Sequence, residues 1–422
     1  MKKQILLLSA LFISLTVFGQ KSEVKSAEKA IKSNNYAAAL QALNKAEPML
    51  ANADQKTKAK YYYFKAMAVY KNGTSTNYEE IGKAFHDLLE YEKNTKEKYS
   101  ADISEISSKL VQRIAKDAQD NYQKAIQTKE PTDYNKAADG FYQVYLLSPI
   151  DTSFLDNAAL LYYFGKDYDK SITSYEKLLD LNYTGAGTIY IATNKETGED
   201  VIYNDKKSMD LQVKVGLVEN PRTELKESKR NTIYKNYAQN FVQKEDFDRA
   251  REIITEGRKE FPSDYALLID EANVYYKKGD EDTFKVKLEE AIQLNPEEPM
   301  LYYNVGVMNM NQGNTDEAIN YFKKAIELKA DYADAWNNIG AAIIETAQPI
   351  IDEMNNSLSD FDKYDRLQVK QLEIYKKAVP YYEKAYELDS NNVSVIQTLM
   401  GLYQNLSEDA KYKELKAKYD QM

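Results

Sequence analysis

A spacing of 34 residues recurs without a gap in the second half of the chain. Four blocks follow one another, beginning at Asn231, Tyr265, Pro299 and Ala333. The fourth position of each block is large, and the eighth is small: Tyr234, Leu268, Tyr302 and Trp336, then Ala238, Ala272, Gly306 and Gly340. A fixed period of this length predicts one small structural unit stacked on copies of itself, and not a single large core.

Each block has the pattern of two amphipathic helices joined by a tight turn. Gly279 and Gly313 stand at position 15, where the end of a helix favours a left-handed residue. Pro262 and Pro296 close the first two blocks, because proline cannot continue a helix. Such a hairpin leaves one apolar face uncovered, so neighbouring hairpins must stack.

This pattern resembles the tetratricopeptide repeat family, and the block Pro299–Tyr332 carries it most fully. Weaker blocks begin at Ala118 and Thr152, and a further unit begins at Val393. The resemblance implies an all-α, right-handed superhelical solenoid with roughly eight or nine units. We expect N-terminal repeats over 20–183, C-terminal repeats over 231–392 and capping helices over 393–422.

Residues 184–230 interrupt the period. Two runs rich in β-formers, Thr188–Thr193 and Val201–Tyr203, flank a loop that contains Gly198, which predicts a β-hairpin. A short helix and the helix-breaking pair Asn220 and Pro221 are expected to follow. This insertion either covers an end of the stack or binds a ligand.

A second interruption lies inside the block at Ala333. From Gly340 to Ala378 the chain advances 38 residues where the other blocks use 12, and the added sequence stays amphipathic. We expect a helical arm over about 345–377 that either braces the stack or docks another molecule. A contact between copies of the chain near Leu358 is a further possibility.

The N-terminus has the pattern of a secretory signal peptide over residues 1–19. Lys2 and Lys3 precede an apolar run from Ile5 to Phe18, and cleavage is expected after Gly19. The sequence contains no cysteine, so we expect no disulfide and no lipid-modified cysteine after the signal peptide. The Phe-Gly-Gln ending and the abundance of Asn, Lys and Tyr are similar to exported proteins of Bacteroidota. A periplasmic location is expected, with an outer-membrane periphery or secretion as alternatives.

Charge and apolar content argue against two classes of partner. Lys and Arg number 56 against 66 Asp and Glu, a net charge of −10, which disfavours nucleic acid and anionic membrane surfaces. No later segment has 18 apolar residues in a row, so no membrane insertion is expected after cleavage.

The sequence offers little for catalysis. His86 is the single histidine, and without cysteine it can complete neither a nucleophilic pair nor a zinc site. The fragment Gly185-Ala186-Gly187 lacks the remaining residues of a phosphate-binding loop. We therefore expect no enzyme activity, no metal and no cofactor. An enzyme, or a protein that binds carbohydrate or another small ligand at the β insertion, is the alternative.

The resemblance implies that the first helix of each repeat lines a concave, partner-binding groove. The corresponding residues are Lys235, Gln239, Gln243, Ile269, Asn273, Tyr276, Lys277, Tyr303, Val307, Met310, Asn311, Asn337, Ala341 and Ile344. The basic clamp with which some family members hold a C-terminal carboxylate is missing here: Asp270 and Met300 occupy two of its positions. A peptide or protein partner, as part of a cell-envelope complex, is expected instead.

Overall fold

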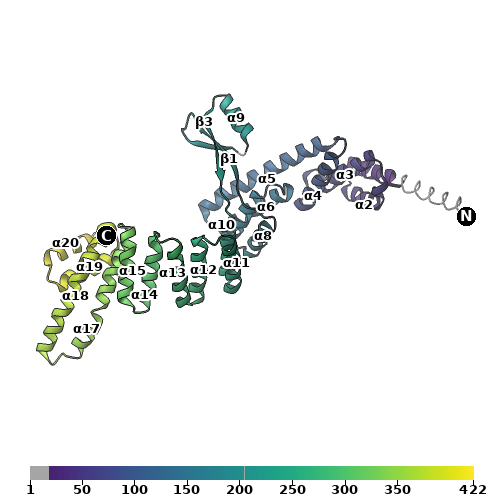
Figure 1. The fold of residues 1–422 in the computed structure, drawn as a ribbon. Coiled ribbons are helices and arrows are strands. Elements are labelled where there is room, and N and C mark those ends of the chain that lie inside the picture. The colour runs from purple at the N-terminus through teal and green to yellow at the C-terminus, as the bar shows by residue number, and fades with distance from the viewer. Residues whose placement is uncertain (1–18, 204) are drawn as a thin grey trace, which may run out of the picture. The chain divides into compact units, whose positions relative to one another are not determined.

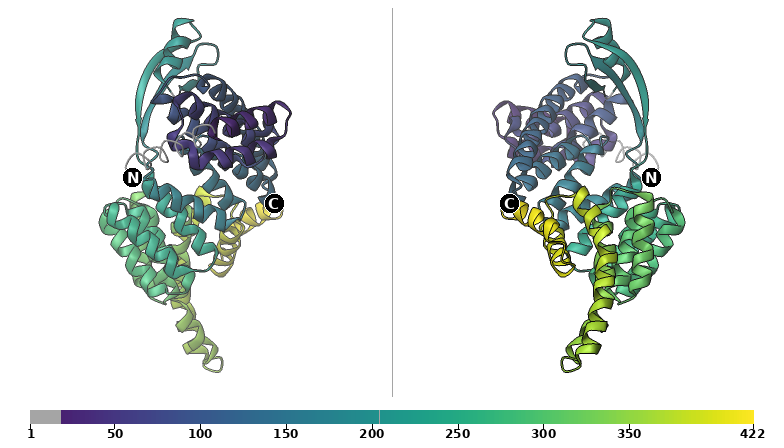
Figure 2. Two further views of the ribbon diagram at one scale, coloured as in Figure 1. Left: turned by 90° about the vertical axis from the view of Figure 1, so that its right-hand side faces the viewer. Right: turned by 90° about the vertical axis from the view of Figure 1, so that its left-hand side faces the viewer.

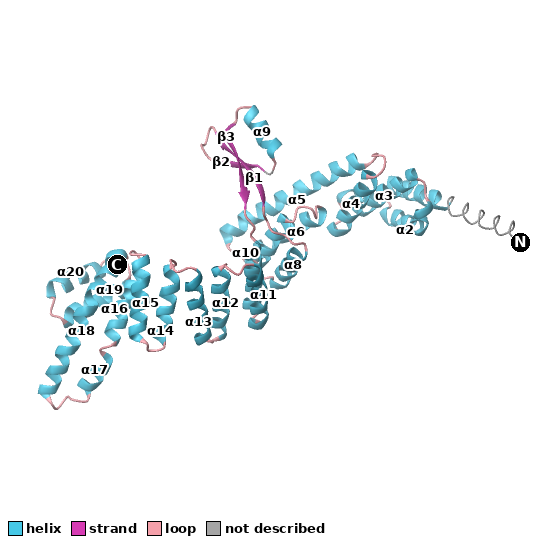
Figure 3. Ribbon diagram, viewed as in Figure 1, coloured by secondary structure: helices cyan, strands magenta, loops and turns pink. Residues whose placement is uncertain are grey.

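The structure is a computed structural model that describes residues 19–203 and 205–422. The chain divides into two compact units, Met1–Asn240 and Phe241–Met422. Helices build both units, and one small sheet belongs to the first (Figures 1 and 3). The expected all-α class with a small β insertion is confirmed. Apart from Gly19, the predicted signal peptide lies outside the described residues.

In the described part of the first unit, residues 19–32 are helical, and short connections link the helices that follow. The helices are α2 (Tyr36–Ala46), α3 (Gln55–Tyr70), α4 (Tyr78–Lys93), α5 (Ser100–Thr128), α6 (Pro131–Leu147), α7 (Ser153–Phe164) and α8 (Tyr168–Asp180), with two 3-10 turns, η1 (Glu47–Asn52) and η2 (Lys71–Gly73). Apolar side chains join successive helices. Phe85 of α4, for example, belongs to one buried cluster with Ile103 of α5 and Val144 of α6.

The insertion folds as a three-stranded sheet with one helix (Figure 3). Its elements are β1 (Gly187–Asn194), β2 (Asp200–Tyr203), α9 (Lys206–Lys214) and β3 (Val218–Lys226). β1 and β2 form the predicted hairpin, with Tyr190 opposite Tyr203. Asn220 and Pro221 lie within β3 but interrupt its regular pairing, as expected of a breaker: the register with β1 shifts between Ile191 and Thr193, and Asn220 has a φ of 50°. β3 is an edge strand of the order β2-β1-β3, where a residue without an N–H is tolerated.

The chain leaves and re-enters the helical part of the first unit at one point. The backbone N–H of Lys229 donates to the carbonyl oxygen of Thr184 at 2.8 Å. Between these two residues, Ala192, Met209 and Val218 form a small buried core of their own. The insertion is therefore a closed excursion with its own packing.

The second unit continues the helical hairpins. α10 (Arg230–Gln243) runs across the boundary, followed by α11 (Phe247–Glu260), α12 (Tyr265–Lys278), α13 (Glu281–Leu294), α14 (Pro299–Asn311), α15 (Thr315–Leu328), α16 (Ala333–Glu345), α17 (Gln348–Asn355), α18 (Phe361–Leu388), α19 (Val393–Asn405) and α20 (Asp409–Tyr419). Among the described residues, no helix combines the length and the apolarity needed to cross a membrane.

Position 8 is small because an aromatic ring from the second helix rests on it. A Cβ added to Gly306 would stand 2.7 Å from the ring of Phe322, and one added to Gly340 would stand 2.5 Å from the ring of Tyr382. Tyr382 is 42 residues from Gly340 in the sequence, yet it fills the position that Phe322 fills in the preceding repeat. The added segment thus leaves the packing of this repeat unchanged.

The residue at position 15 has a left-handed backbone conformation in other blocks as well as at the two predicted glycines. Gly279 and Gly313 have φ values of 83° and 74°. Lys166, Glu245 and Ser407 stand at the same position of their blocks and have φ values of 59°, 60° and 59°. The common turn therefore includes the weaker blocks at Thr152 and Val393, although a side chain is unfavourable in this conformation.

The added segment of the Ala333 block forms α17 and the first turns of α18, which extend away from the other helices of the second unit (Figure 2). Met354 and Leu367 are buried between the two helices, and the Lys363 ammonium pairs with Glu353 at 2.8 Å. At the tip, Leu358 and Phe361 are 64% and 77% exposed. These contacts join the two helices close to the tip, which presents apolar side chains at its end.

Candidate functional site

The predicted groove residues remain accessible in the structure. Each of the fourteen is half-buried or exposed, and none is buried. Lys235 and Gln239 belong to the first unit, whereas the other twelve belong to the second. Within the second unit, α12, α14 and α16 carry all of the groove residues except Gln243.

α14 carries four of the predicted groove residues, Tyr303, Val307, Met310 and Asn311. Val307 packs against the buried clusters on both sides of α14, one that includes Leu268 of α12 and one that includes Ile339 of α16. Tyr303 stacks on Tyr332 with ring centroids 4.9 Å apart. Its hydroxyl accepts a hydrogen bond of 3.2 Å from Asn338, and burial raises its pKa, so it stays neutral.

In the second unit, the predicted groove residues are mostly apolar or amide side chains, with one lysine among them. The apolar members in the second unit are Ile269, Val307, Met310, Ala341 and Ile344, and the amides are Gln243, Asn273, Asn311 and Asn337. Tyr276 is 48% exposed and packs on Phe284 of its own hairpin. None of the predicted residues is acidic. This composition suits a peptide whose backbone is held by amides and whose apolar side chains are buried.

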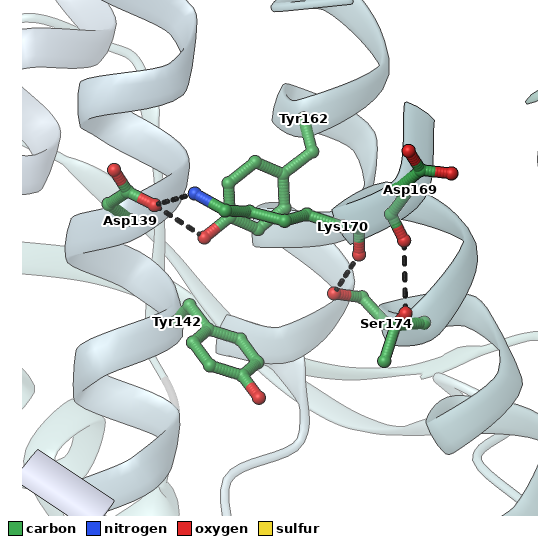
Figure 4. A pocket seen from close by; sticks show the side chains of 7 residues that line it. Asp139, Tyr142, Tyr162, Asp169, Lys170 and Ser174 are labelled. Atoms are coloured by element: carbon green, nitrogen blue, oxygen red, sulfur yellow. Dashed lines mark hydrogen bonds and ion pairs between the residues drawn. The ribbon is translucent and has the colours of Figure 1, made fainter. Parts of the chain in front are cut away.

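A second kind of site lies between the second helices of neighbouring repeats. In the first unit, Asp139 of α6, Tyr162 of α7 and Lys170 of α8 meet beside a pocket of about 360 Å³ (Figure 4). The Tyr162 hydroxyl donates to Asp139 at 2.7 Å, and the Lys170 ammonium donates to the same oxygen at 3.0 Å. The ammonium also lies 5.0 Å from the centre of the Tyr162 ring. We call this cluster a clip and the space beside it a notch.

The same clip recurs at the end of the second unit. The Tyr403 hydroxyl donates to Glu383 at 2.9 Å, the Lys411 ammonium donates to the same oxygen at 2.8 Å, and it lies 5.1 Å from the Tyr403 ring. The notch beside it measures about 320 Å³. In both clips the tyrosine is at position 11 and the lysine at position 19 of one repeat, and the acid comes from the repeat before.

The clip fastens consecutive repeats. Burial, together with the neighbouring carboxylate, raises the pKa of Tyr162 and of Tyr403, so both hydroxyls keep the proton that they donate. The repeat pattern alone gives Tyr162 and Tyr403 no role, and these contacts were not predicted from the sequence. The shared spacing of eight residues from tyrosine to lysine is the signal that identifies them.

We expect Tyr162→Phe to lower the free energy of unfolding of the first unit by about 1 kcal/mol, because it removes one buried hydrogen bond and keeps the ring. Tyr168→Phe is the control, since the Tyr168 ring packs on Tyr163 and no hydrogen bond of its hydroxyl is seen in the described part of the chain. Urea denaturation followed by circular dichroism compares the two. An equal loss of unfolding free energy in both variants would show that the clip hydrogen bond does not stabilise the first unit.

Comparison with family models identifies the repeat. A model described as TPR repeat matches residues 308–345, and one described as tetratricopeptide repeat matches residues 153–184 and 370–392. The matches fall on α14 to α16, on α7 and α8, and on α18 with the turn after it. Tetratricopeptide repeats are therefore present in both units, as the resemblance implied.

Matches to curated proteins are short. The chain is 31% identical over 64 residues to Protein O-mannosyl-transferase Tmtc3 of Drosophila melanogaster, which covers 15% of this chain and 7% of that protein. It is 48% identical over 42 residues to the uncharacterized protein MJ0572 of Methanocaldococcus jannaschii, covering 10% and 49%. The chain thus spans less than half the length of either relative.

Solved structures with a similar course of the backbone include repeat proteins. A crystal structure of MamA protein has a TM-score of 0.34 and 21% identity, covering 45% of this chain and 92% of that one. YrrB, described as a TPR protein with an unusual peptide-binding site, has a TM-score of 0.35 and 16% identity, covering 62% and 97%. Scores this low give no information about ligands.

Proposed function

We propose that this chain is a non-catalytic scaffold of a bacterial cell envelope that binds a peptide or protein partner in the groove of α12, α14 and α16. The accessible apolar strip on α14 is the observation that carries the proposal. Val307 and Met310 remain half-buried although buried clusters lie directly beneath them. Stacked repeats commonly present such extended surfaces to partners.

The side chains at the predicted groove positions restrict the kind of partner that can bind there. In the second unit, Lys277 is the single charged residue among the predicted groove positions, so strongly acidic or basic ligands gain little there. Asn273, Asn311 and Asn337 each offer an amide donor and acceptor to a peptide backbone. An extended segment with apolar side chains at intervals fits this pattern better than a charged small molecule.

The test is recovery of a partner from envelope fractions after mild cross-linking, using the wild-type chain and two variants. Val307→Glu places a charge in the strip and is expected to weaken partner binding by at least about tenfold. Val286→Glu is the matched control, because Val286 is 51% exposed on α13, outside the predicted groove. Recovery of the same partner at equal strength with both variants would contradict the proposal, provided that circular dichroism shows both to be folded.

Export is a separate part of the proposal. It is supported by the signal-peptide pattern of residues 1–19, and the predicted mature chain starts at Gln20. Fractionation of the source bacterium followed by N-terminal sequencing tests it. A chain that stays in the cytoplasm with its N-terminus intact would overturn the envelope location and leave the groove proposal standing.

A further inference from the structure

A third notch, in the second unit, lacks the clip. It lies between α15, α16 and the C-terminal part of α18 and has a volume of about 660 Å³, against about 360 and 320 Å³ for the two notches with clips. Its position-11 residue is Ile343, where the clips have tyrosine. Position 22 of the preceding repeat is Asn320, where the first clip has Asp139.

The lysine of the clip is nevertheless present. When the 26 added residues are discounted, Lys377 stands at position 19, in the place of Lys170 and Lys411. Lys377 and Lys323 both line the notch. Within the described part of the chain, neither lysine takes part in an ion pair. The notch thus keeps the cation of the clip and lacks the ring and the carboxylate.

At two other junctions the residue at position 11 interacts with a basic side chain of the preceding repeat. The Lys285 ammonium donates to the Asn309 side chain at 2.7 Å, and the neighbouring Tyr275 hydroxyl raises the pKa of Arg251. Ile343 has no polar group with which to do this. It instead packs with Ile319 and Tyr381, so the notch has apolar walls beneath the two lysines.

The chain itself exposes a segment with the missing chemistry. At the tip of the arm, Phe361 is 77% exposed and lies between Asp360 and Asp362, while Leu358 beside it is 64% exposed. Phe361 supplies a ring, and the two aspartates supply carboxylates. Asp316 also lines the notch, as Asp169 lines the one in Figure 4, so two lysines face one aspartate and the notch still favours an anion.

The arm tip cannot reach the notch of its own chain. Phe361 and Lys377 lie on the same helix, α18, 16 residues apart. At 1.5 Å per residue the helix holds them about 24 Å apart. The proline within α18, Pro380, comes after Lys377 and does not interrupt this stretch.

We infer that the notch lined by Ile343, Lys323 and Lys377 is a docking site for the arm tip of a second copy of this chain. Phe361 of one copy enters the apolar space beside Ile343 and Tyr381 of the other, and Asp360 and Asp362 pair with the two lysines. The contact uses one side chain in a pocket and a small charged rim, so its dissociation constant is expected on the order of 10 µM. It does not involve the groove of α12, α14 and α16.

Sedimentation equilibrium of the full chain from about 1 to 500 µM measures the association, a range that brackets the expected constant. Two variants are expected to remove it. Phe361→Ser removes the aromatic ring from the tip. The double variant Asn320→Asp with Ile343→Tyr introduces the tyrosine and the carboxylate of a clip beside Lys377, so the notch is filled. This double variant is also expected to have a higher melting temperature than the wild type. Lys324→Glu is the control, because Lys324 is paired with Glu327 at 3.1 Å outside the notch. A monomer over the whole range would overturn the inference.

A charge exchange identifies the two surfaces directly. A chain with Lys323→Glu and Lys377→Glu and a chain with Asp360→Lys and Asp362→Lys should each stay monomeric alone, and the mixture should form a complex. In the mixture, the aspartate-bearing tip of the first chain meets the lysine-bearing notch of the second, and the lysine-bearing tip of the second meets the glutamate-bearing notch of the first. Failure of the mixture to associate, or association that survives Phe361→Ser, would overturn the assignment. Val307→Glu is expected to leave self-association unchanged, so failure of the groove proposal is distinguishable from failure of this one.

Discussion

Gly82→Ala is expected to lower the free energy of unfolding of the first unit by about 3 kcal/mol or more, since overpacking against rigid backbone is at the costly end of its range. A Cβ at Gly82 would overlap the carbonyl oxygen of Leu146, where α4 crosses the end of α6. Backbone cannot swing aside as a flexible side chain does. The helices must separate, and the buried cluster around Phe85 must loosen with them.

Gly401→Ala provides the matched control. Gly401 is also inside a helix, α19, but a Cβ there would meet no atom within 4 Å. Alanine favours a helix over glycine by roughly 0.5–1 kcal/mol, so this variant should be neutral or slightly more stable. Thermal and urea unfolding followed by circular dichroism measure both variants. Equal melting temperatures for Gly82→Ala and the wild type would show that α4 and α6 can move apart without cost.

Glu92→Ala is expected to have an effect of similar size, about 3 kcal/mol, because it leaves several polar groups without an acceptor. The Glu92 side chain has no exposed surface. Its Oε2 accepts hydrogen bonds of 2.8 to 2.9 Å from the backbone N–H groups of Lys98, Tyr99 and Ser100, and one of 2.7 Å from the Ser100 hydroxyl. One carboxylate therefore holds the loop between α4 and α5. Glu90→Ala is the control, since Glu90 is exposed and pairs only at 3.5 Å with Lys93.

The same carboxylate predicts a pH dependence. Burial by itself raises the pKa of Glu92, but the hydrogen bonds from the loop outweigh it, so the pKa lies below its ordinary value of 4.5. A carboxyl group with a depressed pKa contributes stability above its unfolded pKa and loses that contribution as the pH falls through the folded one. Wild type should therefore lose more stability than Glu92→Ala between neutral pH and about pH 3. Parallel losses in the two proteins would contradict this account.

The repeat was predictable because its packing depends on residue size at fixed spacing. Gly306 and Gly340 are small for one reason, the aromatic ring that rests on each. That relation survives the added segment, since Tyr382 packs on Gly340 although 42 residues separate them in the sequence. The left-handed turn was predicted at Gly279 and Gly313 but not at Lys166, Glu245 and Ser407, since a side chain there gives no local sign of a positive φ.

β3 and the clips were not predictable in the same way. β3 contains Asn220 and Pro221, which the strand accommodates because its pairing with β1 is irregular there and because it lies at the edge of the sheet. A clip joins three helices from two repeats, and its acid shifts from position 22 in Asp139 to position 25 in Glu383. One turn of helix separates these positions, so an acid at either one can reach the tyrosine. A search at a fixed period does not detect the acid and the tyrosine as partners, because the acid changes position.

The hydrogen bond between Thr184 and Lys229 makes the sheet replaceable. Because the polypeptide comes back to its point of departure, the 44 residues between them can lengthen, shorten or change sequence without moving the hairpins on either side. A foreign hairpin could be grafted at the same two residues, and natural variants could acquire new surface loops there without loss of the core. The sequence of the sheet and the stability of the helices can thus change independently of each other.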